Sequence, residues 1–387
     1  MLLMTILGVA LVALTLPGTV ELVLLTLASL RPRRPARAAG RPLRLAVVVP
    51  AHDEEASVAR AVESLRRSER VGPRFAVVVV ADNCADRTAA RAEAAGARVL
   101  VRRDPDRRGK GHALRFAFDR LLAEGWEALA VVDADTEVDR RFVPEIRATL
   151  AGAGAAQACY LVRNRGSLRT RLLHVSLLAM NLVRPRGRAA LGLSAGILGN
   201  GFALTAETLA RVPYEATSIV EDLEYHLRLV RGGIRVRFAE GATVRGDMPV
   251  RAAGFATQRA RWEGGRLRML REHVPGLLRD VLRGRLRQIE PLLDLLLLPL
   301  GFHVALLAAA LAIPTTAIRT YAACGLAAVA GHLVVALVLG RALPADVAAL
   351  AAAPVYVAWK IARLPATLRA SHPGARWQRT DRHRRVS

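Results

Sequence analysis

Lysine, cysteine and aromatic residues are all scarce in this 387-residue chain, and each shortage excludes a class of protein. Aromatic residues make up 4% of the sequence, so the chain offers no stacking platform for single-stranded nucleic acid. The three cysteines, Cys84, Cys159 and Cys324, lie far apart, which indicates neither a disulfide framework nor a zinc site. Such cysteine usage is compatible with a reducing, cytosolic environment.

Basic residues, in contrast, are abundant, and nearly all of them are arginine. Lys110 and Lys360 are the only lysines among 57 basic residues, and the formal net charge is +24. A charge of this size suggests nucleic acid or an anionic membrane surface as a partner. The arginines are dispersed along an alanine- and leucine-rich chain, which is more typical of a coding bias than of a binding stripe. We therefore expect no nucleic-acid partner.

The first apolar segment of the chain predicts a membrane anchor. Residues 1–30 are long enough to cross a hydrocarbon core of roughly 30 Å, and Glu21 is the only charged residue among them. A cleaved signal peptide is the alternative, but here the basic residues follow the apolar run instead of preceding it. The basic linker at residues 31–42 then predicts an N-terminus outside the cell and a cytoplasmic segment after it.

A second apolar region, at residues 289–340, predicts a hairpin of two membrane spans, Pro291–Ile313 and Tyr321–Leu339. The shorter apolar stretch at residues 346–362 favours an interfacial or re-entrant helix. With this topology, the basic tail at residues 363–387 is cytoplasmic. We thus expect a multi-pass protein of the plasma (inner) membrane, in contact with membrane lipid, whose middle domain is cytoplasmic.

The middle of the chain, residues 43–250, alternates short apolar strands with amphipathic helices. Strands are expected at residues 45–50, 75–81, 98–101 and 129–132, with a helix after each of the first three. Apolar runs of this kind are typical of strands that are buried on both faces of a parallel sheet. The alternation therefore predicts a Rossmann-like α/β domain with a mostly parallel sheet, in which ligands bind at the carboxyl ends of the strands.

Polar residues gather at those carboxyl ends. The residues that follow the first two strands include Pro50, His52, Glu54 and Asp82. The fourth strand ends in Asp133 and Asp135, whose carboxylates lie on one face of an extended chain. A solvated turn is the more frequent explanation for an isolated Asp-x-Asp, whereas a divalent cation such as Mg²⁺ or Mn²⁺ would balance the two charges. Because three strands place carboxylates at one sheet edge, we favour the metal site.

Taken in order, these segments resemble the inverting family 2 glycosyltransferases, over about residues 43–270. The segments that carry the resemblance are Val48–Glu55, Asp82, Arg108–Gly111, Asp133–Asp135, Gly199–Phe202, Val220–Asp222 and Gln258–Trp262. The last is similar to the Gln-x-x-Arg-Trp motif of the membrane-embedded branch, which includes cellulose, hyaluronan and poly-N-acetylglucosamine synthases. The resemblance implies a GT-A fold, a nucleotide-sugar donor, most often a UDP-sugar, and Mg²⁺ or Mn²⁺.

The resemblance also implies roles for individual residues. Donor nucleotide or diphosphate contacts fall on Pro50, His52, Glu54, Asp82, Lys110, Asp133, Gln258 and Arg261. Metal contacts fall on Asp135 and Asp133, the general base on Asp222 with Glu221 in support, and acceptor contacts on Asn200, Gly201 and Trp262. His52 and Val220 replace a tyrosine and a threonine of the family pattern.

The segment at residues 251–288 is basic and amphipathic and contains the Gln-x-x-Arg-Trp motif. For four of its arginines we expect contacts with anionic lipid headgroups, namely Arg259, Arg266, Arg268 and Arg271. Arg261, in contrast, has a fork-shaped guanidinium suited to binding diphosphate oxygens in pairs.

The sequence therefore predicts a membrane-bound inverting glycosyltransferase. Its expected reaction moves a hexosyl or N-acetylhexosaminyl group from a nucleotide sugar to a saccharide or lipid-linked acceptor, in polysaccharide or glycolipid synthesis. Processive synthesis and single addition both stay open, as do a homo-oligomer and an accessory subunit. The alternative from another class is a non-catalytic membrane scaffold or nucleotide-sugar sensor that retains the fold, and the intact set of charged site residues argues against it.

Overall fold

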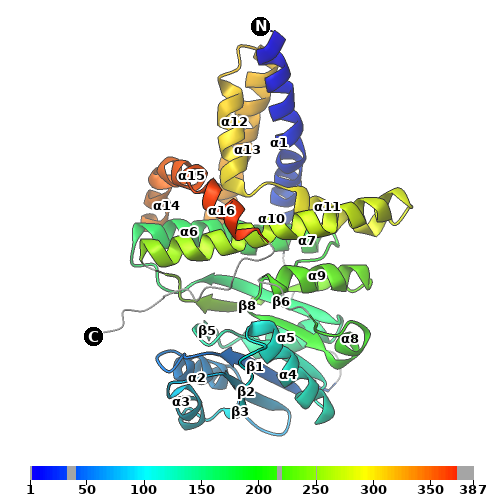
Figure 1. Ribbon diagram of the computed structural model, residues 1–387, viewed down its shortest axis with the longest axis vertical. Helices are drawn as coiled ribbons and strands as arrows, with labels where there is room; N and C mark the ends of the chain where they lie inside the picture. Colours follow the sequence, from blue (N-terminus) through cyan, green and yellow to red (C-terminus); the bar gives the residue numbers. More distant parts are fainter. Residues whose placement is uncertain (1, 33–40, 216–219, 250, 373–387) are drawn as a thin grey trace. The chain divides into compact units, whose positions relative to one another are not determined.

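The computed structural model describes residues 2–32, 41–215, 220–249 and 251–372, which divide into two compact units (Figure 1). The sheet unit comprises residues 32–164 and 193–248, and the helical unit comprises residues 1–31, 165–192 and 249–387. Part of the predicted basic linker, and residues 373–387 of the predicted basic tail, lie outside the described residues. Residues 165–192, which we expected within the middle domain, belong to the helical unit, because their helices pack against α1 (Leu2–Ser29) and α14 (Pro344–Ala349).

The sheet unit is built on one mixed sheet, whose order in the described chain is β3-β2-β1-β4-β7-β6-β8-β5. Its strands are β1 (Leu45–Ala51), β2 (Phe75–Asp82), β3 (Arg98–Arg102), β4 (Ala128–Val131), β5 (Thr136–Val138), β6 (Ala155–Val162), β7 (Phe202–Thr205) and β8 (Val236–Gly246). The first four strands are parallel, as predicted. The last four were not predicted, and among them β7 pairs antiparallel with both β4 and β6.

Helices cover both faces of this sheet. They are α2 (Val58–Ser68), α3 (Thr88–Ala94), α4 (Lys110–Ala123), α5 (Phe142–Leu150), α8 (Ala206–Arg211) and α9 (Glu221–Arg231). Alternate residues of β1 enter two different cores: Val47 and Val49 pack with α2 and α5, whereas Ala46 and Val48 pack with α4. Burial on both faces explains why the strand is a continuous apolar run rather than an alternating one.

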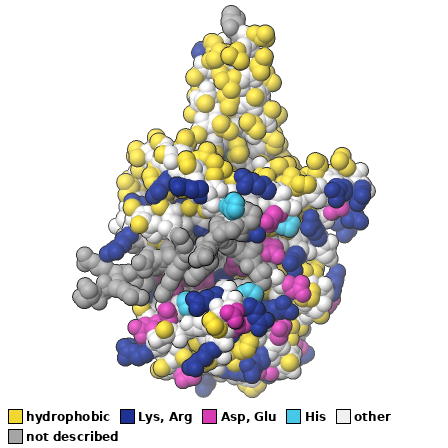
Figure 2. Space-filling view, viewed as in Figure 1, with side chains coloured by type: hydrophobic (Ala, Val, Ile, Leu, Met, Phe, Trp, Pro, Cys, Tyr) yellow, Lys and Arg dark blue, Asp and Glu magenta, His cyan; other side chains and the backbone are white. Residues whose placement is uncertain are grey.

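The helical unit contains the apolar ends of the chain. Its further helices are α6 (Leu168–Leu178), α7 (Arg184–Ala190), α10 (Ala252–Leu282), α11 (Ile289–Leu296), α12 (Leu300–Leu311), α13 (Thr316–Leu339), α15 (Ala353–Ala362) and α16 (Leu364–Ala370). Helices α1, α12 and α13 run side by side (Figure 1). Figure 2 shows hydrophobic side chains over the visible face of this bundle. Exposed apolar side chains of its helices include Ile6, Leu14 and Val338.

Three described helices are long and apolar enough to cross a membrane: Leu2–Ser29, Thr316–Leu339 and Pro344–Ala362. The predicted span Pro291–Ile313 is not one straight helix, because the helices on either side of residues 297–299 are bent by 74°. Pro299 explains this break, since proline disfavours helical backbone at the residue before it and donates no backbone hydrogen bond. The interfacial or re-entrant character of residues 346–362 stays a prediction.

Candidate active site

A single lysine joins two loops at the carboxyl edge of the parallel strands. Lys110 is the first residue of α4, and its ammonium donates to Asp133 Oδ1, 2.5 Å away, at the end of β4. The same ammonium donates to the carbonyl oxygen of Gly199, in the loop before β7. Lys110, Asp133 and the loop before β7 therefore meet at one point, as the strand-end pattern predicts.

Asn200 holds the two aspartates of the Asp-x-Asp segment in place. Its side-chain oxygen accepts from the backbone N–H of Asp133 over 3.1 Å, and its amide nitrogen donates to Thr136 Oγ1 over 2.8 Å. The Thr136 hydroxyl in turn donates to Asp135 Oδ1 over 3.3 Å. Asn200 is buried and supports the two aspartates through these hydrogen bonds, and the acceptor contact that we expected of it stays a prediction.

The two aspartates differ in accessibility. The side chain of Asp133 is 26% exposed, whereas Asp135 is 3% exposed.

Gly201, the other loop residue expected to contact the acceptor, has a φ of +73°, and a Cβ on it would lie 2.8 Å from a methyl group of Val244. This glycine therefore serves the close packing of the loop on the sheet.

Glu221 and Asp222 open α9 beside the same loop. Asp222 Oδ1 accepts from the backbone N–H of Leu223 over 2.9 Å, which is one of the unpaired donors of a helix N-terminus. A Cβ on Gly199, whose φ is +75°, would lie 3.0 Å from Asp222 Oδ2. The Asp222 carboxylate thus packs against the residue whose carbonyl oxygen binds Lys110. Val220 precedes this pair, and Ile219 lies outside the described residues.

Burial and charge shift the pKa values of this strand-end cluster, which we define as Lys110, Asp133, Glu221 and Asp222. Burial raises the pKa of Glu221 to about 7; the positive charge of Lys110 opposes the shift and the neighbouring Asp222 increases it. Burial likewise raises the pKa of Asp222. Burial acts to lower the pKa of Lys110, but its carboxylate neighbours outweigh this effect, so that pKa is raised. A carboxyl with a pKa of about 7 beside a second carboxyl whose pKa is also raised is suited to general-base chemistry.

An aromatic cluster fixes the three elements that carry these groups. Phe118 of α4 and Tyr214 lie edge to face with ring centroids 5.3 Å apart, and Tyr214 lies 4.6 Å from Tyr225 of α9. Phe202 at the start of β7 stacks on Tyr214 at 6.4 Å. Helices α4 and α9 and the loop before β7 therefore share one rigid base, which holds Lys110 near the carboxylates.

The residues predicted at the ends of β1 and β2 bind each other and their neighbours. His52 Nδ1 donates to the carbonyl oxygen of Asp82 over 2.8 Å. Asp82 accepts from Arg102 over 2.6 Å, and both side chains are only 8% exposed. Glu54 accepts from Ser57 Oγ over 2.8 Å at the start of α2. We did not identify Arg102 from the sequence as a partner of Asp82. The signal that could have indicated it is a charged residue in a largely apolar strand.

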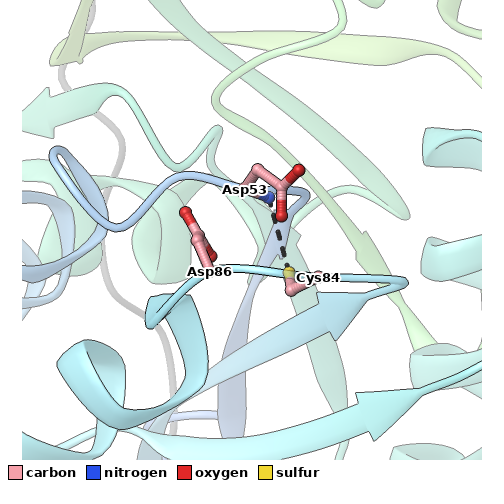
Figure 3. A group of neighbouring side chains, drawn as sticks. All are labelled: Asp53, Cys84 and Asp86. Atoms are coloured by element: carbon pink, nitrogen blue, oxygen red, sulfur yellow. Dashed lines mark hydrogen bonds between the residues drawn. The ribbon is translucent and has the colours of Figure 1, made fainter. Parts of the chain in front are cut away.

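A second group of potential metal ligands lies in the neighbouring loops. Asp53, Cys84 and Asp86, here called the loop cluster, place one ligand atom each within 4.8 Å of one another (Figure 3). These side chains are engaged in joining the two loops: Asp53 Oδ1 accepts from the backbone N–H of Ala85, and Asp86 Oδ2 from that of Glu55. Burial raises the pKa of the Cys84 thiol, which disfavours the thiolate that binds metals.

The remaining predicted residues, Gln258, Arg261 and Trp262, lie on α10 in the helical unit. Gln258 is buried, and the other two side chains are partly buried. Three of the four arginines that we expected at lipid headgroups bind other segments of the helical unit, among them Arg271, which donates to Ser371 Oγ over 3.0 Å. Arg259 donates to the Tyr356 hydroxyl over 2.9 Å, and Arg266 donates to the carbonyl oxygen of Leu297 over 3.0 Å, so both side chains are used inside the helical unit.

Comparisons with known proteins agree with this architecture. The model of the family described as "Glycosyltransferase like family 2" matches residues 42–265. The chain is 24% identical over 233 residues to the probable glycosyltransferase YdaM of Bacillus subtilis, an alignment that covers 57% of this chain and 55% of that protein. It is 33% identical over 102 residues to the low-salt glycan biosynthesis hexosyltransferase Agl6 of Haloferax volcanii, covering 26% of this chain and 23% of that protein. The chain thus spans about half, or less, of the length of these curated relatives.

Among solved structures, the chain is similar to the mannosyltransferase PcManGT of Pyrobaculum calidifontis, which was solved with GDP-mannose and Mn²⁺. The TM-score is 0.56 at 18% identity, and the match covers 92% of this chain and 99% of that one. At this identity the likeness shows the fold, and it confirms the predicted GT-A-type α/β architecture. With a family model that matches most of the chain, the protein belongs to the family 2-like glycosyltransferases.

Proposed function

We propose that this protein is a membrane-bound inverting glycosyltransferase that moves a sugar from a nucleotide donor to a saccharide or lipid-linked acceptor. The observation that carries the proposal is the strand-end cluster, in which one ammonium faces three carboxylates beside the loop before β7. The formal charges of this cluster leave an excess of negative charge. Such a site is suited to a divalent cation and to a reaction that needs a base.

The donor side of the site fits a metal-bound diphosphate. Asp133 and Asp135 would hold Mg²⁺ or Mn²⁺, the ions that carboxylate oxygens and phosphates bind well, and the metal would neutralise charge on the departing diphosphate. The ion pair of Lys110 with Asp133 supports a role for its ammonium in binding phosphate oxygens beside the metal. The presence of Mn²⁺ and GDP-mannose in PcManGT supports a metal and a nucleotide sugar here, and it keeps a GDP-sugar open beside the UDP-sugar that we expected.

On the acceptor side, Asp222 accepts the proton of the acceptor hydroxyl. The acceptor oxygen then bonds to the anomeric carbon as the bond from that carbon to the diphosphate breaks, and attack from the opposite side inverts the configuration. Glu221 shares the excess proton of the acidic pair near neutral pH. We further propose that Gln258 and Arg261 bind the diphosphate and that Trp262 forms a flat wall for the acceptor sugar.

The placement of the protein follows from its apolar helices. We propose that it lies in the plasma membrane, anchored by α1 and α13, with the sheet unit on the cytoplasmic side, where nucleotide sugars are made. The basic residues that follow α1 support this orientation.

The proposal is tested by screening UDP- and GDP-sugars for nucleotide release by the purified protein in detergent with Mn²⁺. Release of nucleoside diphosphate from at least one donor, with the sugar recovered in β or α linkage opposite to that of the donor, is the expected result. If no donor is turned over but nucleotides bind, the scaffold or sensor alternative replaces the enzyme. The number of sugars added to one acceptor separates processive synthesis from single addition.

A further inference from the structure

Helix α15 contacts α10 at residues that lie within or directly after the Gln258–Trp262 motif. The hydroxyl of Tyr356 accepts from Arg259 Nε over 2.9 Å, and Lys360 Nζ pairs with Glu263 Oε1 over 2.9 Å. Arg259 lies within the motif and Glu263 follows it directly. The C-terminal part of the helical unit is therefore fastened to the helix that carries the motif.

An aromatic cluster surrounds this contact. The ring centroid of Phe255 on α10 lies 5.7 Å from that of Trp359 and 6.4 Å from that of Tyr356, and the last two rings stack at 5.8 Å. The Arg259 guanidinium lies over the ring of Tyr356 at 5.6 Å. Phe255, Arg259 and Glu263 occupy positions i, i+4 and i+8, so a single face of α10 receives α15.

The ion pair in this contact is buried. Lys360 is 6% exposed and Glu263 is 11% exposed, and Lys360 Nζ lies 4.5 Å from the ring centroid of Phe302. The lysine stem runs past Gly301 so closely that a Cβ there would lie 3.0 Å from Lys360 Cδ. A side chain at position 301 would therefore crowd the lysine stem, and the Lys360 ammonium lies between the Glu263 carboxylate and the Phe302 ring.

Helix α16 and the residue that follows it contact α10 further along its length. A Cβ on Gly264 would lie 2.8 Å from the backbone carbonyl carbon of Ala370, so the two backbones are in direct contact. About two turns further on, Arg271 donates to Ser371 Oγ over 3.0 Å. Contacts on several successive turns fix both the axial position and the rotation of α10 relative to α15 and α16.

The rotation of α10 decides where its remaining faces point. Arg261 is two residues before Glu263, which places it roughly 160° around the helix from the face that contacts α15. Trp262 lies between these directions, and the Arg259 guanidinium is 5.9 Å from its ring. A rotation of α10 about its axis that breaks the Lys360–Glu263 pair would therefore turn Arg261, on the opposite side of the helix, through the same angle.

We propose that Lys360 and Glu263 are positioning residues of the transferase, because they fix the rotation of α10 and thereby the directions of Arg261 and Trp262. The inference rests on the proposed function, in which those two side chains contact diphosphate and acceptor. It assigns the C-terminal helices α15 and α16 to the catalytic machinery as its support, although they lie about a hundred residues beyond the motif in sequence.

Steady-state kinetics of the full-length protein tests this role, with Lys360→Met and Glu263→Gln as single variants and their combination as a double variant. We expect kcat to fall about 10–100-fold in all three while the donor KM stays within about twofold, because misplaced groups lose more in the transition state than in binding. The double variant removes both charges together, so its thermal unfolding midpoint should recover towards that of the wild type. Recovery of kcat together with that midpoint would overturn the positioning role.

Two further variants complete the kinetic test. Lys360→Arg keeps the charge, yet we expect it to lose activity as Lys360→Met does, because a larger, planar guanidinium would replace a compact ammonium in a buried position. Arg268→Met is the matched control, since Arg268 also forms an ion pair on α10, with Glu272 over 2.7 Å, but on its exposed side. Its kcat should equal that of the wild type; a loss as large as that of Lys360→Met would attribute the effect to α10 in general.

The scarcity of lysine offers a readout that needs no turnover. An N-hydroxysuccinimide acetyl ester can modify only the N-terminal amine, Lys110 and Lys360, and mass spectrometry resolves each site. We expect Lys360 to react at least about tenfold more slowly in the wild type than in Glu263→Gln, with Lys110 as internal reference. Equal rates of Lys360 acetylation in the two proteins would contradict the contact between α15 and α10. A wild type inactive on every donor contradicts the proposed function, whereas an active wild type with an equally active Lys360→Met contradicts this inference alone.

Discussion

Two groups of acidic side chains lie at the carboxyl edge of the same sheet, and they are built differently. In the loop cluster, the carboxylates of Asp53 and Asp86 accept from backbone N–H groups of the opposite loop, so their charge is used to join β1–α2 to β2–α3. In the strand-end cluster, Asp133, Glu221 and Asp222 face one ammonium, and burial raises the pKa values of the last two. We propose that uncompensated charge, and not the number of acids, distinguishes a catalytic group of acids from a structural one.

The largest expected effect is that of removing the proposed base, which belongs to the strand-end cluster and not to the loop cluster. Asp222→Asn removes the proton acceptor but keeps the shape that packs against Gly199, so kcat should fall by about 10²–10⁴-fold. Binding of UDP or GDP, measured by calorimetry, should stay nearly unchanged. A parallel loss of nucleotide affinity would move Asp222 from the acceptor side to the donor side of the site.

Lys110→Met is expected to have the next largest effect. The variant removes the ammonium that donates to Asp133 and Gly199, and the three carboxylates are then left without their shared counter-charge. Loss of a charged hydrogen bond to the diphosphate predicts a decrease of about 10–100-fold in kcat/KM, mainly through KM. The measurement is a donor titration at saturating Mn²⁺, and a change confined to kcat would place Lys110 away from the donor.

The acidic pair also predicts how stability depends on pH. The pKa of Glu221 is raised from its ordinary value of 4.5 to about 7, so between these pH values the folded protein holds a proton that the unfolded chain releases. The stabilisation is complete below about pH 4.5 and is lost as the pH rises through about 7, with a magnitude of roughly 1–3 kcal/mol. Glu221→Gln should flatten this dependence and unfold at a higher temperature than the wild type at pH 8, with EDTA present. An unchanged pH profile would show that Glu221 is not the titrating group.

The comparison also shows what the sequence could predict. Strands β1, β2 and β4 were predictable because Val47, Val78 and Val131 belong to continuous apolar runs, which burial on both faces requires. Strands β5, β7 and β8 were not, because β5 and β7 are short and β8 carries charged and glycine residues, so pairing with neighbouring strands determines them. Strand β6 (Ala155–Val162) is largely apolar and buried, and we missed it in the sequence. The contact between Lys110 and Gly199 joins residues far apart in the chain, and only the fold brings them together.

Roles within the site were harder to predict than its location. Asn200 belongs to a loop motif that indicates a ligand contact, yet its amide is buried and hydrogen bonded to Asp133 and Thr136. Arg259 lies on a basic amphipathic helix, yet it binds Tyr356. In both cases the side chain's partner comes from a distant part of the sequence, and a local pattern carries no information about it.

The smallest expected effect is that of Asp53→Asn in the loop cluster. This variant tests whether the loop cluster takes part in metal binding. Asp53 has a φ of 52°, which asparagine tolerates, and the amide oxygen of asparagine can still accept from the backbone N–H of Ala85. The half-saturating Mn²⁺ concentration should therefore stay within about twofold of the wild type, whereas Asp133→Asn should raise it about tenfold or more, because a coordinating carboxylate is lost. If both variants shift the Mn²⁺ requirement equally, the loop cluster binds the metal as well. Backbone hydrogen bonds would then be no barrier to coordination, and charge compensation would fail as the criterion that separates the two groups.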